Sequence, residues 1–526
     1  TMKKRVIVVG SGGAGLTAAI SARKTGAEVV LLSKTGCAEA SCTAYSGGLF
    51  SLSSGTVSPD DHYRRIMETG RYVNDPSLVR ILADHSEATL RVISKWGVSL
   101  KVTTSGHATA RKTAPSRIMG GGGMTRELAS IARREGVVIL ENHIVSRLLV
   151  GMHGVEGVEA VDWKRGKAFS FGASAVILAT GGGGAIYERT DKPLRMTGDG
   201  YALALDAGLE LVDMEYVQFY PMGWDQKGYP VWMVGLGLLD YIPVTDEKGR
   251  EFLKEAFPLW GVSTGKEANL FARDRAALLL AGHAVKGGRT LLHLEKFREE
   301  DLSLPDVQAS LLFDLPPEKR SAPVHVSPVQ HYFTGGVPMD SEGRTSIPGL
   351  FVCGEVSGGV DGASRMGGNA LTNILVFGLR AGKAAAEEAM ASSAVSDAVS
   401  KLPECVLRSG REGVSPAEVR CELRSIVQEG LSPWRNAEGI ERCISKIELL
   451  NASRRALNIA SSLDLLHAME LHGLHRTAEA VARASFTRKE SRGVHFREDF
   501  PNESEEWKRR IRILLEEGAV TARVGE

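Results

Sequence analysis

Residues 4–15, KRVIVVGSGGAG, begin with a β-branched run and end in a glycine-rich turn. The helical pattern LTAAISARKTG follows, and a second apolar run, EVVLLSK, comes after it. Strand, glycine turn, helix and strand in this order predict a βαβ unit with G-x-G-x-x-G at Gly10, Gly12 and Gly15. Glycines here let backbone N–H groups and the helix N-terminus approach a pyrophosphate, whereas the structural alternative is a tight turn without a ligand.

The rest of the chain indicates which dinucleotide would bind. An NAD site favours an acidic residue at the end of the second strand, but this strand ends in Ser33-Lys34. Further glycine-rich segments are far apart in the sequence: SCTAYSGG (41–48), ATGG (179–182), TGDG (197–200), CGEVSGG (353–359) and RMGGNAL (365–371). Together they could enclose one long ligand, with Glu355 bound to sugar hydroxyls, so FAD is favoured over a nicotinamide dinucleotide.

Composition excludes several classes of partner. The 526 residues suffice for two to four domains, and lysine plus arginine (64) nearly cancels aspartate plus glutamate (63), so we expect neither nucleic acid nor a membrane surface. The six cysteines form no C-x-x-C pair, which argues against haem-c, zinc-ribbon or ferredoxin-type ligation, and we predict no metal site. Scattered cysteines, the lack of a signal-peptide pattern in TMKKRVIVVG and the absence of a transmembrane-length run predict a cytoplasmic protein without direct membrane insertion.

The order of patterns predicts an α/β fold with a Rossmann-like FAD-binding domain, an inserted α+β capping domain and a C-terminal helical domain. Residues 144–178 alternate apolar and polar positions, which is typical of a small β-meander. The small, polar stretch ASSAVSDAVSKLP is a plausible linker. The predicted domains are FAD-binding at 1–220 and 329–392, capping at 221–328, and C-terminal helices and tail at 403–526.

Several ordered motifs resemble the succinate dehydrogenase/fumarate reductase flavoprotein family, which includes L-aspartate oxidase. GSGGAG and LLSK match the start of the family pattern, and EYVQFYPMG (215–223) stands where the family has E-F-V-Q-F-H-P-T-G. LFARDRAA contains the family's Arg-Asp pair. QHYFTGG (330–336), GEVSGGVDGASRMGGNAL (354–371) and RKESRGVHFREDFP (488–501) follow in the family's order, so the resemblance spans nearly the whole chain.

The resemblance implies a reaction and roles for individual residues. In this family, hydride passes between flavin N5 and a carbon next to a carboxylate, with coupled proton transfer. Arg365 and His331 would clamp one substrate carboxylate, for which a planar guanidinium is suited, and Arg273 would donate the proton. Each residue also has a structural alternative: Arg365 could neutralise the reduced flavin, His331 could be a core histidine, and Arg273 could pair with Asp274.

The resemblance also implies which residues hold FAD. They are Gly10, Gly12, Gly13, Ala14, Gly15, Ser33, Lys34, Ser41, Thr43, Gly47, Gly48, Val145, Ala179, Thr180, Gly181, Asp199, Gly354, Glu355, Arg365, Asn369, Ala370 and Leu371. Ser41 stands where respiratory members have the histidine that is covalently joined to FAD. Because a serine cannot form that link, we expect noncovalent FAD, as in L-aspartate oxidase.

The substrate side departs from the family pattern. Tyr220 replaces the histidine and Met222 the threonine of Q-F-H-P-T-G, and PVWMVGLG (230–237) aligns with T-E-x-x-R-G-E-G, so that apolar residues replace its arginine and second glutamate. A second substrate carboxylate buried there would lack donors, at a cost of ~3–5 kcal/mol. Tyr220 is either a substitute acid or packing. We predict that the apolar end of the pocket is lined by Met222, Trp232, Leu236 and Phe333.

These features favour an FAD-dependent oxidoreductase acting on CH–CH or C=C bonds, an enoate reductase/dehydrogenase whose substrate has one carboxylate or carbonyl end and one apolar end. One alternative is a flavin oxidase akin to L-aspartate oxidase. Another is a flavin-bearing subunit that relays electrons within a larger iron–sulfur complex. Because no iron–sulfur or haem ligands are evident in this chain, electrons must come from elsewhere, and an iron–sulfur partner subunit is plausible. Residues 403–526 are the expected interface with a partner or with a second copy in a homo-oligomer.

Overall fold

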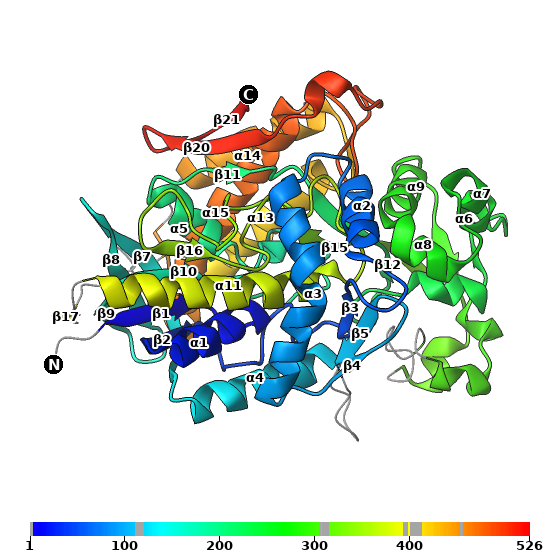
Figure 1. The fold of residues 1–526 in the computed structure, drawn as a ribbon. Coiled ribbons are helices and arrows are strands. Elements are labelled where there is room, and N and C mark those ends of the chain that lie inside the picture. Colours follow the sequence, from blue (N-terminus) through cyan, green and yellow to red (C-terminus); the bar gives the residue numbers. More distant parts are fainter. Residues whose placement is uncertain are drawn as a thin grey trace.

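A five-stranded parallel sheet forms the centre of the fold (Figure 1). The computed structural model describes residues 4–110, 120–304, 307, 315–392, 398–399, 413–452 and 456–525. The sheet contains, in spatial order, β16 (Leu350–Val352), β10 (Ala175–Leu178), β1 (Arg5–Val9), β2 (Glu28–Ser33) and β6 (Val138–Glu141). β1 and β10 are buried along their whole length, as strands covered on both faces must be.

The turn between β1 and α1 (Gly13–Thr25) requires glycine at two positions. Gly10 has φ +112°, and a Cβ at Gly10 would lie 2.3 Å from the carbonyl oxygen of Ala179. A Cβ at Gly15 would lie 1.9 Å from the carbonyl oxygen of Gly10. α1 connects the parallel neighbours β1 and β2, so the predicted βαβ unit is confirmed.

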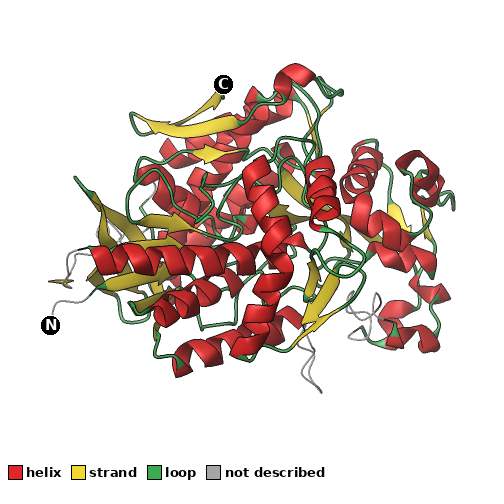
Figure 2. Cartoon of the chain, in the orientation of Figure 1, coloured by secondary structure: helices red, strands yellow, loops and turns green. Residues whose placement is uncertain are grey.

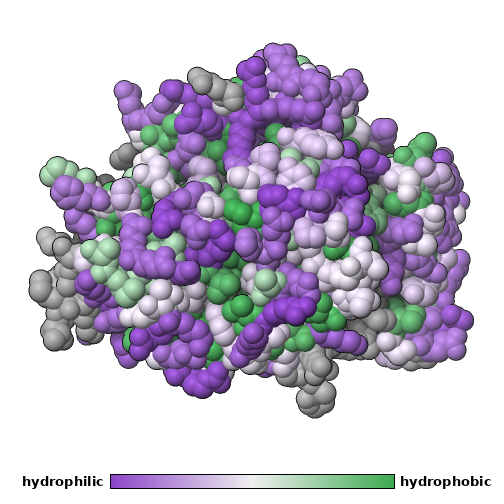
Figure 3. Space-filling view, in the orientation of Figure 1, coloured by the Kyte–Doolittle hydropathy of each residue, from purple (hydrophilic) through white to green (hydrophobic). Residues whose placement is uncertain are grey.

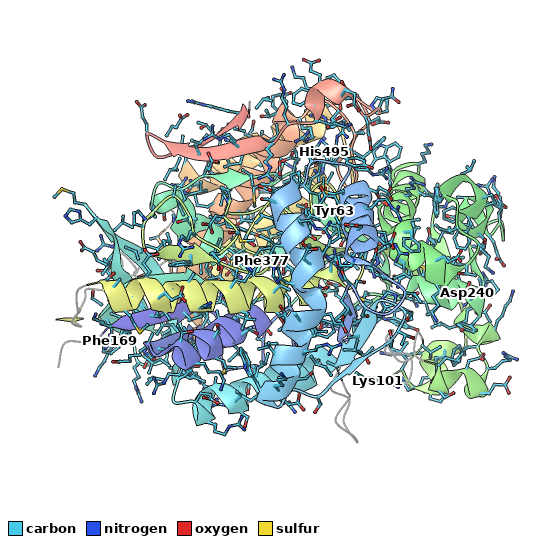
Figure 4. The ribbon with its side chains drawn as sticks, viewed as in Figure 1. Tyr63, Lys101, Phe169, Asp240, Phe377 and His495 are labelled. Carbon is cyan, nitrogen blue, oxygen red and sulfur yellow. The ribbon has the colours of Figure 1, made fainter. Side chains whose placement is uncertain are left out.

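Helices cover the sheet on the side that faces the viewer in Figure 1, where α11 (Asn369–Ala391) lies along α1. Phe377, labelled in Figure 4, is one of the fully buried side chains of α11. The other elements of this part are α2 (Pro59–Thr69), α3 (Pro76–Trp96), α4 (Gly120–Arg134) and a small sheet of β3 (Leu49–Ser51), β5 (His107–Ala110) and β4 (Leu100–Val102).

The predicted β-meander is confirmed as three antiparallel strands at the left of Figure 1. They are β7 (His143–Gly151), β8 (Gly154–Asp162) and β9 (Lys167–Gly172), and β17 (Ala398–Val399) pairs with β9. Of the predicted linker, only 391–392 and 398–399 belong to the described residues. After β10, the chain forms α5 (Asp199–Asp206) and β11 (Leu211–Val212).

Between two paired strands, β12 (Val217–Trp224) and β15 (Val324–Phe333), the chain forms what we call the capping unit, at the right of Figure 1. It has its own apolar core. Its elements include η2 (Leu236–Asp240), β13 (Val244–Thr245), α6 (Phe252–Glu255), α7 (Phe257–Trp260), α8 (Gly265–Phe271), α9 (Arg273–Val285) and β14 (Thr290–Leu292). The predicted boundaries after 220 and 328 fall inside β12 and β15, and the division into domains stays a prediction.

Among its described residues, the C-terminal part contains long helices and a β-hairpin, which lies next to the C-terminus in Figure 2. The helices are α13 (Pro416–Gly430), α14 (Ala437–Ala452) and α15 (Ser462–Thr487). The hairpin of β20 (Ile511–Glu516) and β21 (Ala519–Val524) pairs with β11, which the helical prediction for this region did not include. Alternating buried residues and a positive-φ turn at Glu517 and Gly518 favour the hairpin.

The C-terminal motif 488–501 ties this part to the start of β12 through buried charges. Arg488 donates from Nε to Glu215 at 2.5 Å and from Nη1 to Glu490 at 2.9 Å. Arg435 contacts His495, labelled in Figure 4, at 2.9 Å between Nη1 and Nδ1. Because these groups are paired with one another, they fix the segment that leads into β12.

The face shown in Figure 3 is mainly hydrophilic, with hydrophobic residues in small separate patches. Among the helices of the described residues, none is both long enough and apolar enough to cross a membrane.

Candidate active site

A cavity of about 690 Å³ lies at the carboxyl ends of the parallel strands. Its wall includes Gly10 after β1, Lys34 after β2, Ala179 after β10 and Cys353 after β16. Ligands of open parallel sheets bind at these ends, because the loops and helix N-termini converge there. This cavity is therefore the candidate site.

Most of the residues predicted to hold the cofactor line this cavity. They are Gly10, Gly12, Gly13, Ala14, Ser33, Lys34, Ser41, Thr43, Gly47, Gly48, Val145, Ala179, Thr180, Gly181, Asp199, Glu355, Arg365, Ala370 and Leu371. Gly15, Gly354 and Asn369 lie behind the wall. A Cβ at Gly354 would lie 2.8 Å from the Ala14 Cβ, so this glycine permits close packing. Asn369 begins α11, and its Oδ1 lies 3.0 Å from His62 Nε2.

Arg273, the predicted proton donor, begins α9 and lines the cavity. Its Nε donates to Asn269 Oδ1 at 3.1 Å, and its Cζ lies 5.2 Å from the centroid of the Tyr220 ring. Burial lowers the pKa of Arg273 to about 10, because the charged form has lost its water. The structural alternative was an ion pair between Arg273 and Asp274. In the described residues, Asp274 instead pairs with Arg71 at 3.4 Å.

Asn269, which lines the cavity beside Arg273, was missed by the sequence analysis. It lies on α8, whose first turn is held by the Asp240 carboxylate, which accepts from Gly265 N at 2.7 Å; Asp240 is labelled in the capping unit in Figure 4. The spacing of four residues between Asn269 and Arg273 is a signal for a contact on one helix face. In the structure, however, Asn269 lies on α8 and Arg273 begins α9, and the two helices are separated at Ala272.

Tyr220 lies one layer behind the cavity wall. Its hydroxyl donates to Asn269 Oδ1 at 2.7 Å and accepts from Leu236 N at 3.0 Å. Its side chain is 1% exposed, and the residue is not part of the cavity lining. The hydroxyl is therefore engaged in holding Asn269, which in turn holds Arg273.

The predicted apolar end needs correction. Of its four residues, Trp232 lines the cavity, whereas Met222, Leu236 and Phe333 do not. Met222 and Leu236 belong to the core of the capping unit, and Phe333 to the core around the central sheet. The motif located the strand, but it did not show what each side chain packs against, and regular alternation does not hold at Met222 because the pairing of β12 with β15 is irregular between Tyr220 and Gly223.

Two residues that the sequence analysis did not name complete the apolar end. Met233 and Tyr45 line the cavity with Trp232, and the Tyr45 and Trp232 rings lie 5.7 Å apart between centroids. The Trp232 indole N–H is buried and has no hydrogen-bond partner within the described part of the chain. The wall is thus aromatic and largely apolar, with two neutral side-chain donors, the Trp232 indole N–H and the Tyr45 hydroxyl.

His331 lines the cavity from β15 and is held by two residues that the sequence analysis missed, Asp191 and Lys192. Asp191 Oδ2 lies 2.6 Å from His331 Nδ1, and Lys192 Nζ lies 3.3 Å from the same nitrogen. Burial lowers the pKa of His331 to about 3. The contacts of His331 are therefore polar and specific, unlike those of a histidine packed in an apolar core.

Arg365 lines the same cavity with most of its hydrogen-bonding capacity unused. Its Nη1 donates to the Met366 carbonyl oxygen at 3.3 Å, and its Cζ lies 4.3 Å from the Tyr332 ring centroid. Its Nε is buried and finds no partner among the described residues. Burial raises the pKa of nearby Asp361 to about 6, although Arg365 opposes this shift. Arg273 and Arg365 are called the arginine pair below.

At the other end of the cavity, four charged residues form what we call the Glu470 cluster: the buried Glu470 and Arg420, and the partly buried Lys34 and Arg195. Glu470, from α15, pairs with Lys34 at 3.0 Å, with Arg195 at 2.7 Å and with Arg420. Lys34 also pairs with Asp199 at 2.7 Å. Lys34, Arg195 and Asp199 line the cavity, so a C-terminal helix supports its wall.

Two family models match this chain. The model described as FAD binding domain matches residues 5–371, and that described as fumarate reductase flavoprotein C-term matches residues 420–522. A fumarate reductase (CoM/CoB) subunit from Methanothermobacter marburgensis is 33% identical, covering 96% of this chain and 96% of its own length. The chain belongs to the fumarate reductase/succinate dehydrogenase flavoprotein family.

Other members of this family are similar over comparable lengths. The L-aspartate oxidase of Streptomyces coelicolor is 29% identical, covering 97% of this chain and 91% of its own length. The Escherichia coli quinol fumarate reductase structure has the same fold, with a TM-score of 0.86 and 24% identity over 99% of this chain and 96% of its own. This chain is therefore an FAD-dependent oxidoreductase of the fumarate reductase/succinate dehydrogenase type, with the predicted α/β fold.

The cavity suits the FAD of this family. Gly12 precedes α1 and has no side chain to cap it; Thr43 Oγ1 accepts from Gly13 N at 3.2 Å, and the following N–H groups of the first turn remain for a pyrophosphate. The Thr180 hydroxyl on the wall is buried and lacks a partner among the described residues, so it too can bind the cofactor. Metal ligation has no comparable support, because no group of three or more His, Cys, Asp or Glu suited to a metal ion occurs in the described ranges.

Proposed function

We propose that this flavoprotein is an enoate reductase/dehydrogenase, whose substrate has an activated C=C or CH–CH bond, one carboxylate or carbonyl end, and one apolar end. One observation carries the proposal: Trp232 and Met233 line the same cavity as Arg273 and Arg365. The arginine pair suits a carbonyl or carboxylate oxygen. A second carboxylate against this wall would find only two neutral side-chain donors, the Trp232 indole N–H and the Tyr45 hydroxyl, which is too little for a buried charge.

In this proposal, some side chains bind the substrate and others serve proton transfer. FAD, when bound, supplies the two-electron chemistry. Arg365 orients the polar end of the substrate, with His331 beside it, and Arg273 holds the proton destined for the substrate carbon. Asn269 fixes Arg273 by accepting from Nε, which leaves the terminal nitrogens of this guanidinium for the substrate. Tyr220 is a positioning residue, because its hydroxyl acts through Asn269.

Anaerobic reoxidation of the flavin tests this function. The bound FAD is reduced, excess reductant is removed, and the return of flavin absorbance is followed after addition of fumarate, cinnamate or an alkyl acrylate. We expect the aryl or alkyl acrylate to react at least ~10-fold faster than fumarate, because only its apolar end suits the wall of Trp232 and Met233. Much faster turnover of fumarate would refute the proposal.

We further propose that FAD is bound noncovalently. Ser41 lines the cavity, and its Oγ accepts from Ala44 N at 3.1 Å, which gives this side chain a structural role in its own turn. Acid precipitation of the holoprotein should leave the yellow flavin in the supernatant. A yellow pellet would contradict the argument from Ser41.

An iron–sulfur electron-transfer partner is proposed as the source of electrons. The relative from Methanothermobacter marburgensis is named as a subunit, which supports a role within a complex. Purification from the native host under anaerobic conditions should yield iron together with a second polypeptide. The L-aspartate oxidase relative favours a second candidate, an oxidase, for which aerobic turnover would release hydrogen peroxide in proportion to substrate consumed.

A further inference from the structure

Among the described residues, the His331 ring makes polar contacts through one of its two nitrogens, Nδ1. Its Nδ1 lies 2.6 Å from Asp191 Oδ2, and no hydrogen bond to its Nε2 is formed within the described residues. Because the ring lines the cavity, Nε2 is the nitrogen left for a ligand. The chemistry available at Nε2 depends on where the proton of the imidazole lies.

The contacts at Nδ1 determine the position of this proton. Lys192 Nζ lies 3.1 Å from Asp191 Oδ1, and His331 and Lys192 together hold the pKa of Asp191 below its usual value. Lys192 Nζ lies 3.3 Å from Nδ1, whereas Asp191 Oδ2 lies at 2.6 Å, so the carboxylate makes the shorter contact. An ionised carboxylate only accepts, so His331 Nδ1 donates to it, and Lys192, which also only donates, then acts on Nδ1 through its charge and not through a hydrogen bond. A neutral imidazole that carries its proton on Nδ1 has a lone pair on Nε2, and Nε2 then accepts a hydrogen bond.

The surrounding charges favour the neutral ring. Asp191 alone favours the imidazolium, whereas burial, Lys192 and Arg365 act against it, and together they lower the pKa of His331 to about 3. The Tyr220 ring packs edge-on at 5.5 Å and contributes no charge. Lys192 therefore matters in a particular way: its ammonium neutralises Asp191, which would otherwise stabilise a proton on Nε2.

We propose that Asp191 and Lys192 hold His331 as a neutral acceptor at Nε2, so that the substrate presents a hydrogen-bond donor there and a carbonyl oxygen to Arg365. A carboxamide end offers these two groups side by side, whereas an ionised carboxylate offers only acceptors. The inference rests on the proposed function and deepens it: within the class of enoates and their derivatives, it selects an amide-type polar end. His331 recognises the substrate, and Lys192 is a positioning residue that acts through it.

Binding to the oxidised holoprotein tests the inference without requiring turnover. The ligands are 3-phenylpropanamide and 3-phenylpropanoate, which match in shape and differ in charge and in the donor. Each is titrated from pH 6 to 8.5, and its dissociation constant is obtained from the change in the flavin spectrum. For the wild type we expect the amide to bind about 10-fold more tightly, with a preference independent of pH, because a neutral His331 does not titrate in this range.

Lys192→Met gives the decisive comparison, and Lys192→Arg, which keeps the charge, is its control. Without the ammonium, Asp191 favours the imidazolium, so Nε2 donates and the carboxylate should gain about 10-fold relative to the amide, most strongly at low pH. A simple attraction between Lys192 and the ligand predicts the opposite sign, since removing a cation then weakens carboxylate binding. Lys192→Arg should retain the wild-type preference.

The outcomes separate this inference from the proposed function. Tighter wild-type binding of the carboxylate, or weaker carboxylate binding in Lys192→Met, overturns the inference and leaves the enoate activity standing. Failure of both ligands to bind, together with inert cinnamate in the reoxidation assay, overturns both. A preference for the amide that reverses in Lys192→Met and persists in Lys192→Arg supports the inference.

Discussion

The two ends of the cavity treat buried charge differently. In the Glu470 cluster, one carboxylate is paired with three cations. The arginine pair forms no ion pair among the described residues and instead uses the amide oxygen of Asn269 and the carbonyl oxygen of Met366. A buried group whose capacity is satisfied supports the fold, whereas one with unused donors is available to a ligand. From this difference we expect the Glu470 cluster to support the cavity wall and the arginine pair to contact a ligand.

The largest effect should come from Arg273→Gln. The side chain remains polar and its amide N–H can still donate to Asn269, but an amide is not a general acid, so we expect the rate of flavin reoxidation by a saturating acrylate to fall about 10³-fold. FAD content should not change. The matched control is Arg275→Gln on the same helix, which is outside the cavity lining. A loss of only a few fold would mean that Arg273 is not the donor.

Arg365→Met should affect binding more than chemistry. Removing the guanidinium leaves the polar end of the ligand without its charged donor, and we expect the dissociation constant of a substrate analogue to rise about 100-fold. Arg365→Lys keeps the charge but not the planar arrangement of donors, so its loss should be intermediate. An unchanged dissociation constant, with a lowered flavin reduction potential, would favour the alternative in which Arg365 only neutralises the reduced flavin.

The Glu470 cluster should respond in stability rather than in substrate binding. Glu470→Gln leaves Arg195 and Arg420 without this charged partner, whereas Lys34 keeps Asp199, and removing one member of a buried ion pair costs ~3–5 kcal/mol. Urea unfolding should show this loss, and heating should release FAD fluorescence at a lower temperature. Glu479→Gln on the same helix, whose carboxylate has one arginine partner at 3.4 Å, should lose less. If Glu470→Gln were as stable as the wild type but bound the ligand more weakly, the proposed difference between the two ends of the cavity would be wrong.

Most residues predicted to hold the cofactor line the cavity, because they lie in contiguous motifs, and their contacts with FAD stay a prediction. Gly10, Gly12 and Gly13 follow β1 directly, so a local pattern of strand, turn and helix locates them. Within those motifs, the sequence did not separate residues that line the cavity from residues that pack behind it. Gly15 and Asn369 lie behind the wall, since the same motif serves both binding and close packing.

At the substrate end, the sequence did not reveal which residues contact each predicted side chain. Asn269, Asp191 and Lys192 belong to no motif that the sequence analysis used, and they matter because folding brings them to Arg273 and His331. Glu470 reaches the cofactor wall across more than 400 residues of sequence from Lys34. Met222 was assigned to the pocket because its strand was recognised, but a motif does not reveal which face of the strand is covered.

The smallest effect, and the most diagnostic of Tyr220, should come from Tyr220→Phe. The ring that packs beside Arg273 and His331 remains, and only the hydroxyl is lost. Leu236 N–H then lacks its acceptor and Asn269 one of its donors, so we expect ~1–3 kcal/mol of destabilisation and a rate reduced by about 10-fold or less.

A general acid behaves differently from a positioning residue in this test. If Tyr220 donated the proton, Tyr220→Phe would reduce the rate by about 10²–10⁴-fold and remove a basic limb from the pH–rate profile. If it only positions Arg273 through Asn269, the profile keeps its shape and Asn269→Ala causes a loss at least as large, because both contacts to Oδ1 disappear. Measuring the two variants over the same pH range therefore decides between two roles of Tyr220: fixing the geometry of Arg273 through Asn269, or donating the proton itself.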